Sequence, residues 1–353
     1  MKLHMDKTSF KVLLDDIYEK SGVREDVLEK DYYVTLLLKE LSIKQQNGLP
    51  AYFKGGTALY KALKTINRFS EDIDLSVDTR GCSRSQSDKR LENATKKYSV
   101  LERNREDGKT NKSVIISVYD YEPVTVYDEN DALQRFGRLK IEATSFTISE
   151  PVEILEIAPM IYTYATTEQK AILETQYDVR PFSIKTISLE RAFIDKLFAA
   201  EAYTRASKEP HRAFEAAKHI YDLAVMSKLP RIEALFDNDE LMTRLLDIRM
   251  EEEAGRLDGI PEVTPQQFSF FLDIADNHEV MKAYETMQNQ YVLTASNRIP
   301  YNTAISAINR IFGELQNCHA WTHYEISKEL RLKITRKKQE QLSTKKNNLG
   351  RSR

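Results

Sequence analysis

The chain has 353 residues, of which 30% are charged and 41% hydrophobic. At this length two domains with separate cores are expected, and no window approaches the roughly 18 uncharged apolar residues of a membrane helix, which excludes a membrane-spanning protein. Acids near the start, where a signal peptide would be apolar, and only two cysteines, Cys82 and Cys318, favour a protein of the reducing cytoplasm without a disulfide framework or zinc site.

Two helices are expected first. From Ser9 to Leu41 the apolar residues recur at helical spacing, and Gly22 interrupts the pattern. The segment AYFKGGTALYKAL then predicts a short strand over 51–54, followed by a helix of about two to three turns with Thr57 as its N-cap. DIDLSV, residues 72–77, alternates strictly and therefore predicts a strand with one apolar face and one acidic face.

A polar stretch over residues 78–112 follows. It predicts an insertion made of a loop, a surface helix near 86–103 and a second loop, outside the core. Strands are expected again in SVIISVYDYEP and RLKIEATSF, followed by the mixed segments PVEILEI and FSIKTIS. From Leu189 to about Leu342 the pattern is almost wholly helical, so an α/β half precedes an α-helical half.

The turn Gly55-Gly56-Thr57 is a candidate anion site. A helix start leaves backbone N–H groups unpaired and carries a partial positive charge. Two glycines let a phosphate approach the backbone without an obstructing Cβ. The Lys-Ser/Thr ending of a P-loop is absent, and the chain has no GxGxxG motif. A plain tight turn is the alternative explanation.

Asp72 and Asp74 form a candidate metal site, because carboxylates two residues apart on a strand lie on one side and repel each other. Oxygen ligands of this kind select Mg²⁺ or Mn²⁺, which commonly share their shell with substrate phosphates. Glu142, in RLKIEATSF, adds a third carboxylate if its strand neighbours DIDLSV, and such a group suits in-line displacement at phosphorus. The alternatives are a solvated strand end and a surface pair of Glu142 with Lys140.

Four sequence blocks resemble a known family. GGTALYKAL and RFSEDIDLSV resemble the nucleotidyltransferase superfamily motif, in which a glycine-rich turn and helix precede a D-x-D strand. With EKDYYVTLLLKEL before them and LERAFIDKLFAAEAY and KHIYDL after them, the closer resemblance is to the AbiEii/AbiGii toxin family, which includes the MenT-type toxins. The chain departs from that family at Asp195, where Glu is usual, at Lys218, where Arg is frequent, and in a slightly longer spacing between Thr57 and Asp72.

The resemblance implies a metal-dependent nucleotidyltransferase that moves an NMP from an NTP to an acceptor and releases pyrophosphate. It also implies a nucleotidyltransferase-type mixed sheet with flanking helices over 1–187, and a helical domain over 188–327 that completes the cleft. The implied site has Asp72, Asp74, Glu142, Lys196 and Asp222 as catalytic residues, the first three also as ligands of Mg²⁺ or Mn²⁺. The expected nucleotide-binding residues are Gly55, Gly56, Thr57, Arg68, Ser70 and Lys196.

Several of these residues carry alternatives. Lys196 falls within the apolar arc of its helix, which suits an ammonium that binds the triphosphate or a carboxylate, or one that snorkels to solvent. Asp222 would orient the triphosphate or help to activate the acceptor, or else pair with Lys218 one turn before it. Arg68 and Ser70, just before the first aspartate, either contact phosphate or brace the metal strand.

The resemblance also implies partners. Members act as the toxin of a toxin–antitoxin or phage-defence pair with a separately encoded antitoxin, and it favours RNA as acceptor, in particular the tRNA 3′ end. Residues 328–353 hold ten Lys or Arg against two Glu, a local charge of +8 within a net charge of −2, and could hold RNA electrostatically or form a solvated terminus. The rival functions are a small-molecule, antibiotic-type nucleotidyltransferase and an inactive binding module of the same fold.

Overall fold

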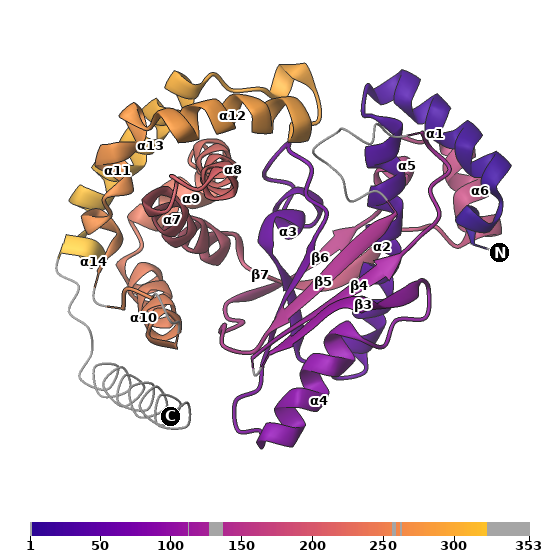
Figure 1. Cartoon of the computed structure of the whole chain (residues 1–353), viewed down its shortest axis with the longest axis horizontal. Helices are drawn as coiled ribbons and strands as arrows, with labels where there is room; N and C mark the ends of the chain where they lie inside the picture. The colour runs from indigo at the N-terminus through magenta and orange to yellow at the C-terminus, as the bar shows by residue number, and fades with distance from the viewer. Residues whose placement is uncertain (1, 112, 127–136, 256–258, 262, 323–353) are drawn as a thin grey trace, which may run out of the picture. The chain divides into compact units, whose positions relative to one another are not determined.

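The computed structural model describes residues 2–111, 113–126, 137–255, 259–261 and 263–322 (Figure 1). The basic tail predicted over 328–353 lies outside these residues. The chain divides into two compact units: a first unit of Met1–Ser188 with Thr286–Arg298, and a second unit of Leu189–Glu285 with Ile299–Arg353. None of the helices in the described part is long and apolar enough to cross a membrane.

The first unit is built on a mixed sheet. Among the described residues the sheet has seven strands in the order β3-β4-β5-β2-β1-β7-β6. The pairs β2–β5 and β1–β7 are parallel and the others are antiparallel. This confirms the predicted mixed α/β fold. The strands are β1 (Ala51–Lys54), β2 (Ile73–Val77), β3 (Glu102–Asn111), β4 (Val114–Asp120), β5 (Arg138–Thr144), β6 (Val152–Ile157) and β7 (Phe182–Ile187).

Helices flank this sheet (Figure 1). The two expected before the first strand are confirmed, and Gly22 ends the first of them in the left-handed region at φ 69°. α4 packs on β2, β4 and β5, and α2 packs on β7. The helices of this unit are α1 (Lys7–Ser21), α2 (Glu25–Gln46), α3 (Gly55–Lys61), α4 (Arg84–Thr95), α5 (Met160–Thr163) and α6 (Thr167–Tyr177), with a 3₁₀ turn, η1, at Leu3–Met5.

Two local predictions are wrong. Thr57 is not an N-cap, because α3 begins at Gly55 with Lys54 before it, and the Thr57 hydroxyl bonds elsewhere. The polar stretch after β2 is not only helix and loops: its helix ends at Thr95, and residues 102–111 pair with β4 as the outermost strand. An edge strand pairs with another strand on one side only, and its other side faces solvent, so a run of polar residues can form one.

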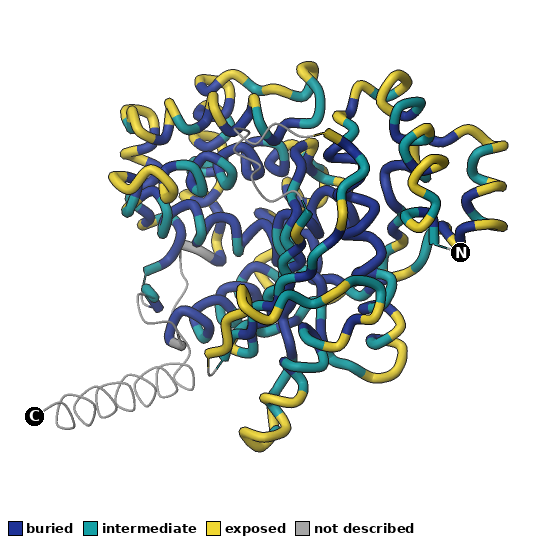
Figure 2. Tube along the Cα trace, turned by 45° about the vertical axis from the view of Figure 1, so that its right-hand side comes forward, coloured by how far each residue is buried: buried dark blue, intermediate teal, exposed yellow. Residues whose placement is uncertain are grey.

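The second unit is helical, as predicted from Leu189 onward. Its longer helices bury apolar stripes, and α7 packs against α8 while α8 packs against α13. Figure 2 shows long buried stretches along this part of the chain. Its helices are α7 (Leu189–Arg205), α8 (Pro210–Met226), α9 (Pro230–Phe236), α10 (Asp239–Gly255), α11 (Phe270–Asp273), α12 (His278–Tyr291), α13 (Tyr301–Asn317) and α14 (His319–Thr322), with 3₁₀ turns η2 (Pro265–Gln267) and η3 (Ile274–Asp276). The end of α12, from Thr286, and the 3₁₀ turn η4 (Ala295–Asn297) belong to the first unit.

Candidate active site

Strand pairing brings three carboxylates to one part of the sheet. β2 and β5 are parallel neighbours with Asp74 level with Glu142, and Asp72 stands one residue before β2. The prediction that the Glu142 strand neighbours the aspartate strand is therefore confirmed. Residues level with each other on neighbouring strands point to the same face, so Asp74 and Glu142 share a face of the sheet.

The carboxyl group of Asp74 is crowded by negative charge. Removal from water, followed by repulsion from Asp72 and Glu142, raises the pKa of Asp74 to about 6, although Lys54 and Lys140 act against the shift. The positive charge that the protein supplies here therefore does not fully compensate the carboxylates.

Lys140 lies among these acids. Its Nζ is 2.9 Å from Asp72 Oδ2 and 3.9 Å from Glu142 Oε2. Burial alone would lower the pKa of Lys140, but attraction to Asp72, and then to Asp74 and Glu142, outweighs burial and raises it. The surface pair considered from the sequence linked Lys140 to Glu142, whereas the closer contact goes to Asp72.

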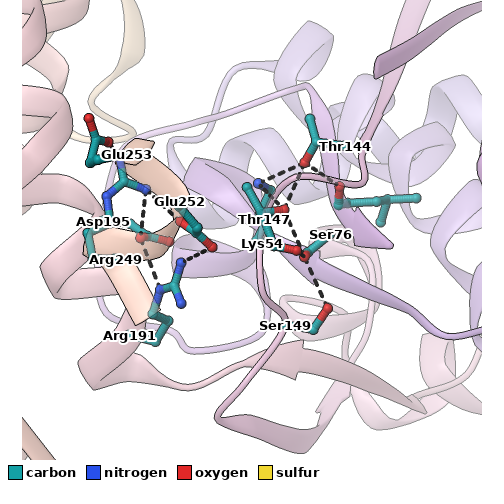
Figure 3. A network of polar contacts seen from close by, with 11 residues as sticks. Lys54, Ser76, Thr144, Thr147, Ser149, Arg191, Asp195, Arg249, Glu252 and Glu253 are labelled. Atoms are coloured by element: carbon teal, nitrogen blue, oxygen red, sulfur yellow. Dashed lines mark hydrogen bonds and ion pairs between the residues drawn. The ribbon is translucent and has the colours of Figure 1, made fainter. Parts of the chain in front are cut away.

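Lys54 approaches the same face from β1, where it stands level with Asp74. Its ammonium donates to the hydroxyls of Thr144 and Thr147, each at 3.3 Å (Figure 3). These hydroxyls also contact each other at 2.9 Å, and Thr147 donates to Ser76 at 2.8 Å. These hydroxyls therefore hold the ammonium of Lys54, a residue of the strand next to β2, in a fixed position.

The three carboxylates are ligand types that suit a divalent cation, although their side chains are not arranged as a metal site. Carboxylate oxygens are the ligands that Mg²⁺ and Mn²⁺ prefer, and the residual negative charge at Asp74 is what such an ion would neutralise. Within the described ranges, no three His, Cys, Asp or Glu side chains are already grouped around a metal position. Asp72 is held instead by the ammonium of Lys140.

The two glycines leave room beside the backbone for side chains that follow them in the chain. Gly55 has φ 78°, in the left-handed region, and a Cβ there would lie 2.1 Å from Asp74 Oδ2. A Cβ on Gly56 would lie 2.7 Å from Ser70 Oγ and 3.0 Å from Arg68 Nη2. Any other residue would push these side chains away, so the Gly-Gly turn is required by close approach as well as by backbone conformation.

The segment before β2 is fixed on both sides. Thr57 is fully buried, and its hydroxyl donates to the backbone carbonyl of Asp72 and lies 3.1 Å from Ser70 Oγ. Arg68 is also buried, and its Nη1 donates to the carbonyl of Phe69 at 3.2 Å. Phe69 N in turn donates to the carbonyl of Tyr291 at 2.7 Å. Thr57 and Arg68 therefore fix the position of the segment that leads into β2.

Three consecutive charged residues of α2, Glu29 to Asp31, are buried and hold different segments. Glu29 accepts hydrogen bonds from the backbone N–H groups of Val124 and Thr125, at 2.7 and 3.1 Å. Lys30 forms an ion pair with Glu71, which directly precedes Asp72. Sequence reasoning missed these residues, although three charges in succession within an apolar helical pattern were a visible signal.

Asp31 fixes α3. Its Oδ1 lies 2.6 Å from Lys61 Nζ and accepts a hydrogen bond from the Tyr60 hydroxyl at 2.6 Å. Its Oδ2 accepts from Met160 N at 2.6 Å. Because Tyr60 and Lys61 lie at the end of the helix that begins at Gly55, Asp31 positions the glycine turn from the far end of α3.

In the second unit, Lys196 and Asp222 form a buried ion pair. Lys196 Nζ lies 2.7 Å from Asp222 Oδ2, and the two side chains are 9% and 0% exposed. Lys196 therefore does not snorkel to solvent. Lys218, the alternative partner considered for Asp222, binds Glu215 at 2.6 Å.

Tyr284 adds a polar group near this pair. Burial, followed by Tyr221, Tyr301 and Asp222, raises the pKa of Tyr284, so its hydroxyl stays protonated at neutral pH. That hydroxyl is buried and has no hydrogen-bond partner among the residues that the structure describes. A donor without an acceptor beside a buried ion pair is costly unless it serves a ligand or a water.

A second ionic network joins α7 to α10 (Figure 3). Arg191 Nε lies 3.0 Å from Asp195 Oδ1, and Arg191 Nη2 lies 2.6 Å from Glu252 Oε1. Arg249 Nη1 contacts the same two acids at 3.3 and 2.9 Å. Of the charged residues in LERAFIDKL, Arg191 and Asp195 therefore support the helix packing, whereas Lys196 binds Asp222.

The family model described as "Nucleotidyl transferase AbiEii toxin, Type IV TA system" matches residues 36–307. Among curated proteins there is no match. Among solved structures, JHP933 from Helicobacter pylori is similar with 15% identity and a TM-score of 0.41, over 92% of this chain and 99% of that one. A candidate nucleotidyltransferase from the same organism is similar with 16% identity and a TM-score of 0.40, over 83% and 99% of the two chains.

The raised pKa of Asp74 predicts a stability gain for Asp74→Asn. Above pH 6 the wild-type carboxylate is ionised in the folded state at a cost, which fades as the pH falls from about 6 to 3.8. We expect Asp74→Asn to raise the free energy of unfolding at pH 8, without metal, by up to about 3 kcal/mol. The gain should vanish near pH 4. The control is Glu156→Gln, an exposed acid on β6, which should change little; equal effects of the two variants at pH 8 would contradict the crowding.

The Lys30–Glu71 pair predicts a non-additive result. Lys30→Met leaves Glu71 buried without its cation and should cost about 3–5 kcal/mol in urea unfolding. Adding Glu71→Gln should recover more than about 1 kcal/mol of that loss. Lys20→Met, which breaks the exposed pair with Asp16, is the control and should cost less than about 1 kcal/mol. Additive losses in the double variant would show that the pair is not a unit.

Proposed function

Because the chain belongs to the AbiEii nucleotidyl transferase toxin family of Type IV toxin–antitoxin systems, we propose that it transfers an NMP from an NTP to an acceptor hydroxyl. In this reaction the hydroxyl oxygen forms a bond to the α-phosphorus while the bond to the bridging oxygen breaks, and pyrophosphate leaves. The observation that carries the proposal is the carboxylate group of Asp72, Asp74 and Glu142 on adjacent parallel strands.

In the proposal these three carboxylates hold Mg²⁺ or Mn²⁺. When bound, such an ion neutralises phosphate charge and activates the attacking hydroxyl. Lys54 and Lys140 are cations on the same part of the sheet, and attraction from both already lowers the charge cost at Asp74. We assign them to the phosphates of the incoming NTP, where their charge offsets the charge that the nucleotide brings.

The glycine turn and the segment before β2 are assigned to the nucleotide. Gly55 and Gly56 leave the backbone bare, and Arg68 and Ser70 lie against Gly56. A guanidinium and a hydroxyl are suitable donors to phosphate oxygens. Thr57, whose hydroxyl is used within the protein, takes part by positioning this segment.

Lys196 and Asp222 complete the proposed set. The family resemblance supports Lys196 as a triphosphate ligand and Asp222 as the residue that orients it or helps to activate the acceptor. The buried pair supports a functional role, because an ion pair in an apolar helix packing contributes little net stability compared with apolar residues of similar size.

For the acceptor we propose RNA, and in particular the tRNA 3′ end, in a MenT-like reaction. The support is the family resemblance, together with the +8 charge of residues 328–353. A Type IV toxin has a separately encoded antitoxin as its partner. Action in the cytoplasm, where tRNA and NTPs are found, and a role in phage defence belong to the same proposal.

The direct test is incubation with each α-labelled NTP, Mg²⁺ and total cellular RNA. We expect label in RNA with wild-type protein, and a loss of at least about 100-fold with Asp72→Asn, on the scale of a lost transition-state contact. Glu156→Gln should transfer normally. Label found in small molecules instead of RNA would exclude the RNA acceptor but retain the enzyme class.

Metal binding has a separate measure. Mg²⁺ should raise the Tm of the wild-type protein and raise that of Asp72→Asn much less, because ligand binding to the folded state stabilises it by mass action. A transfer reaction that proceeds fully in EDTA would contradict the metal assignment.

A last prediction concerns Lys196. Lys196→Met should lower transfer by about two orders of magnitude, but it also leaves Asp222 buried without its cation. The double variant Lys196→Met/Asp222→Asn should recover stability in thermal unfolding without recovering transfer. Lys218→Met, which breaks a pair on the same α8 helix as Asp222, is the control. If the double variant regains both properties, the pair is a structural bridge.

A further inference from the structure

A basic cavity of about 390 Å³ opens in the first unit between the end of α2 and α4. Its lining includes the cations Lys44, Arg90 and Lys97 and the amides of Asn47 and Asn93. Among the described residues no Asp or Glu lines it, and neither does an aromatic ring. The composition suits an anionic, hydrogen-bonding ligand and gives no surface on which a base could stack.

The three cations are not neutralised by contacts in the cavity wall. Lys44 Nζ donates to the carbonyl of Asn93 at 3.1 Å and lies 3.4 Å from the centre of the Tyr98 ring. Arg90 Nη1 donates to the carbonyl of Asp78 at 2.7 Å. Lys97 is exposed and forms no ion pair within the part of the chain that the structure describes.

Acids near the cavity attract these cations but have closer partners of their own: Asp78 attracts Arg90 but binds Arg80 at 2.7 Å, and Glu92 attracts Lys97. Both carboxylate oxygens of Glu40 accept from Ser99 N at 2.9 Å, and Glu92 binds Lys96 at 2.9 Å. Burial lowers the pKa of Lys44 to about 8, with Lys97 acting in the same direction and Glu40 against it. The ammonium of Lys44 is therefore short of negative charge, which an anion in the cavity would supply.

The cavity is separate from the carboxylate site. Pro50, in its lining, directly precedes β1, and Arg90 binds the residue that follows β2. Asp74 and Gly55 lie at the opposite ends of these strands. At about 3.3 Å per residue, the four residues from Asp74 to Asp78 span about 13 Å. The cations of the cavity are thus a second group, additional to Lys54 and Lys140.

We propose that this cavity is a second phosphate-binding site, which takes a phosphate group carried either by a free nucleotide or by a nucleic-acid backbone. Lys44, Arg90 and Lys97 supply the charge, and Asn47 and Asn93 supply amide groups for the remaining oxygens or an attached sugar. The cavity volume is sufficient for a phosphate with a sugar. The site does not depend on the transfer reaction.

The test uses the full chain in EDTA and measures the binding of inorganic phosphate by calorimetry at pH 7. Lys97→Glu reverses one exposed charge of the cavity and should weaken phosphate binding by about tenfold or more. Lys89→Glu makes the same change on the exposed surface of α4, outside the lining, and should bind like wild type. Phosphate should also raise the pKa of Lys44 in wild type and in Lys89→Glu. NMR of labelled lysine measures this pKa.

Two further probes distinguish the source of the phosphate. AMP that binds more tightly than phosphate, with the same loss in Lys97→Glu, assigns a free nucleotide. A short single-stranded RNA that binds more tightly than both phosphate and AMP, with the same loss in Lys97→Glu, assigns a nucleic-acid backbone. Equal phosphate affinity in wild type, Lys97→Glu and Lys89→Glu, or an unchanged pKa of Lys44, would overturn the proposal. Because no NTP or metal is present, that failure would leave the proposed transferase function untouched.

Discussion

The parallel pairing of β2 with β5 is the contact on which the candidate site depends. It sets Asp74 level with Glu142, and a slip of one residue would put Ile73 or Ile141 where a carboxylate now stands. Like charges do not gather spontaneously. The free energy that holds them comes from the other face of the same strands, where Ile73, Leu75 and Ile141 are at most 1% exposed.

Three lysines place positive charge near this pairing. Lys140 contacts the acids directly, Lys54 stands on the adjoining strand, and Lys30 acts through Glu71, the residue before Asp72. Buried ion pairs of the last kind contribute little net stability, but they are costly to break from one side. Their effect is to define where the acidic strand and the glycine helix lie, and the Asp31–Lys61 pair has the same effect on α3.

The sequence indicated those parts of the site that follow from alternation along one strand. Asp72 and Asp74 could be recognised because their apolar partners stand on alternate positions, and the same argument placed Glu142. It could not show that Lys140 binds Asp72 more closely than Glu142, or that Lys196 binds Asp222, because such contacts depend on strand register and on helix packing between residues distant in the chain. The charges at 29–31 were visible but uninterpretable without their partners. The edge strand β3 was missed because its residues are polar on both faces.

The polar edge strand β3 affects how readily the protein associates with other molecules. β3 lies at one end of the sheet order, and six of its ten residues, ERNREDGKTN, are charged. An outermost strand with open backbone groups can recruit a strand from another molecule, and charged side chains oppose this growth. The same sheet thus holds repelling carboxylates on its inner strands and mixed charges on its edge strand β3, where they oppose pairing with a strand of another molecule.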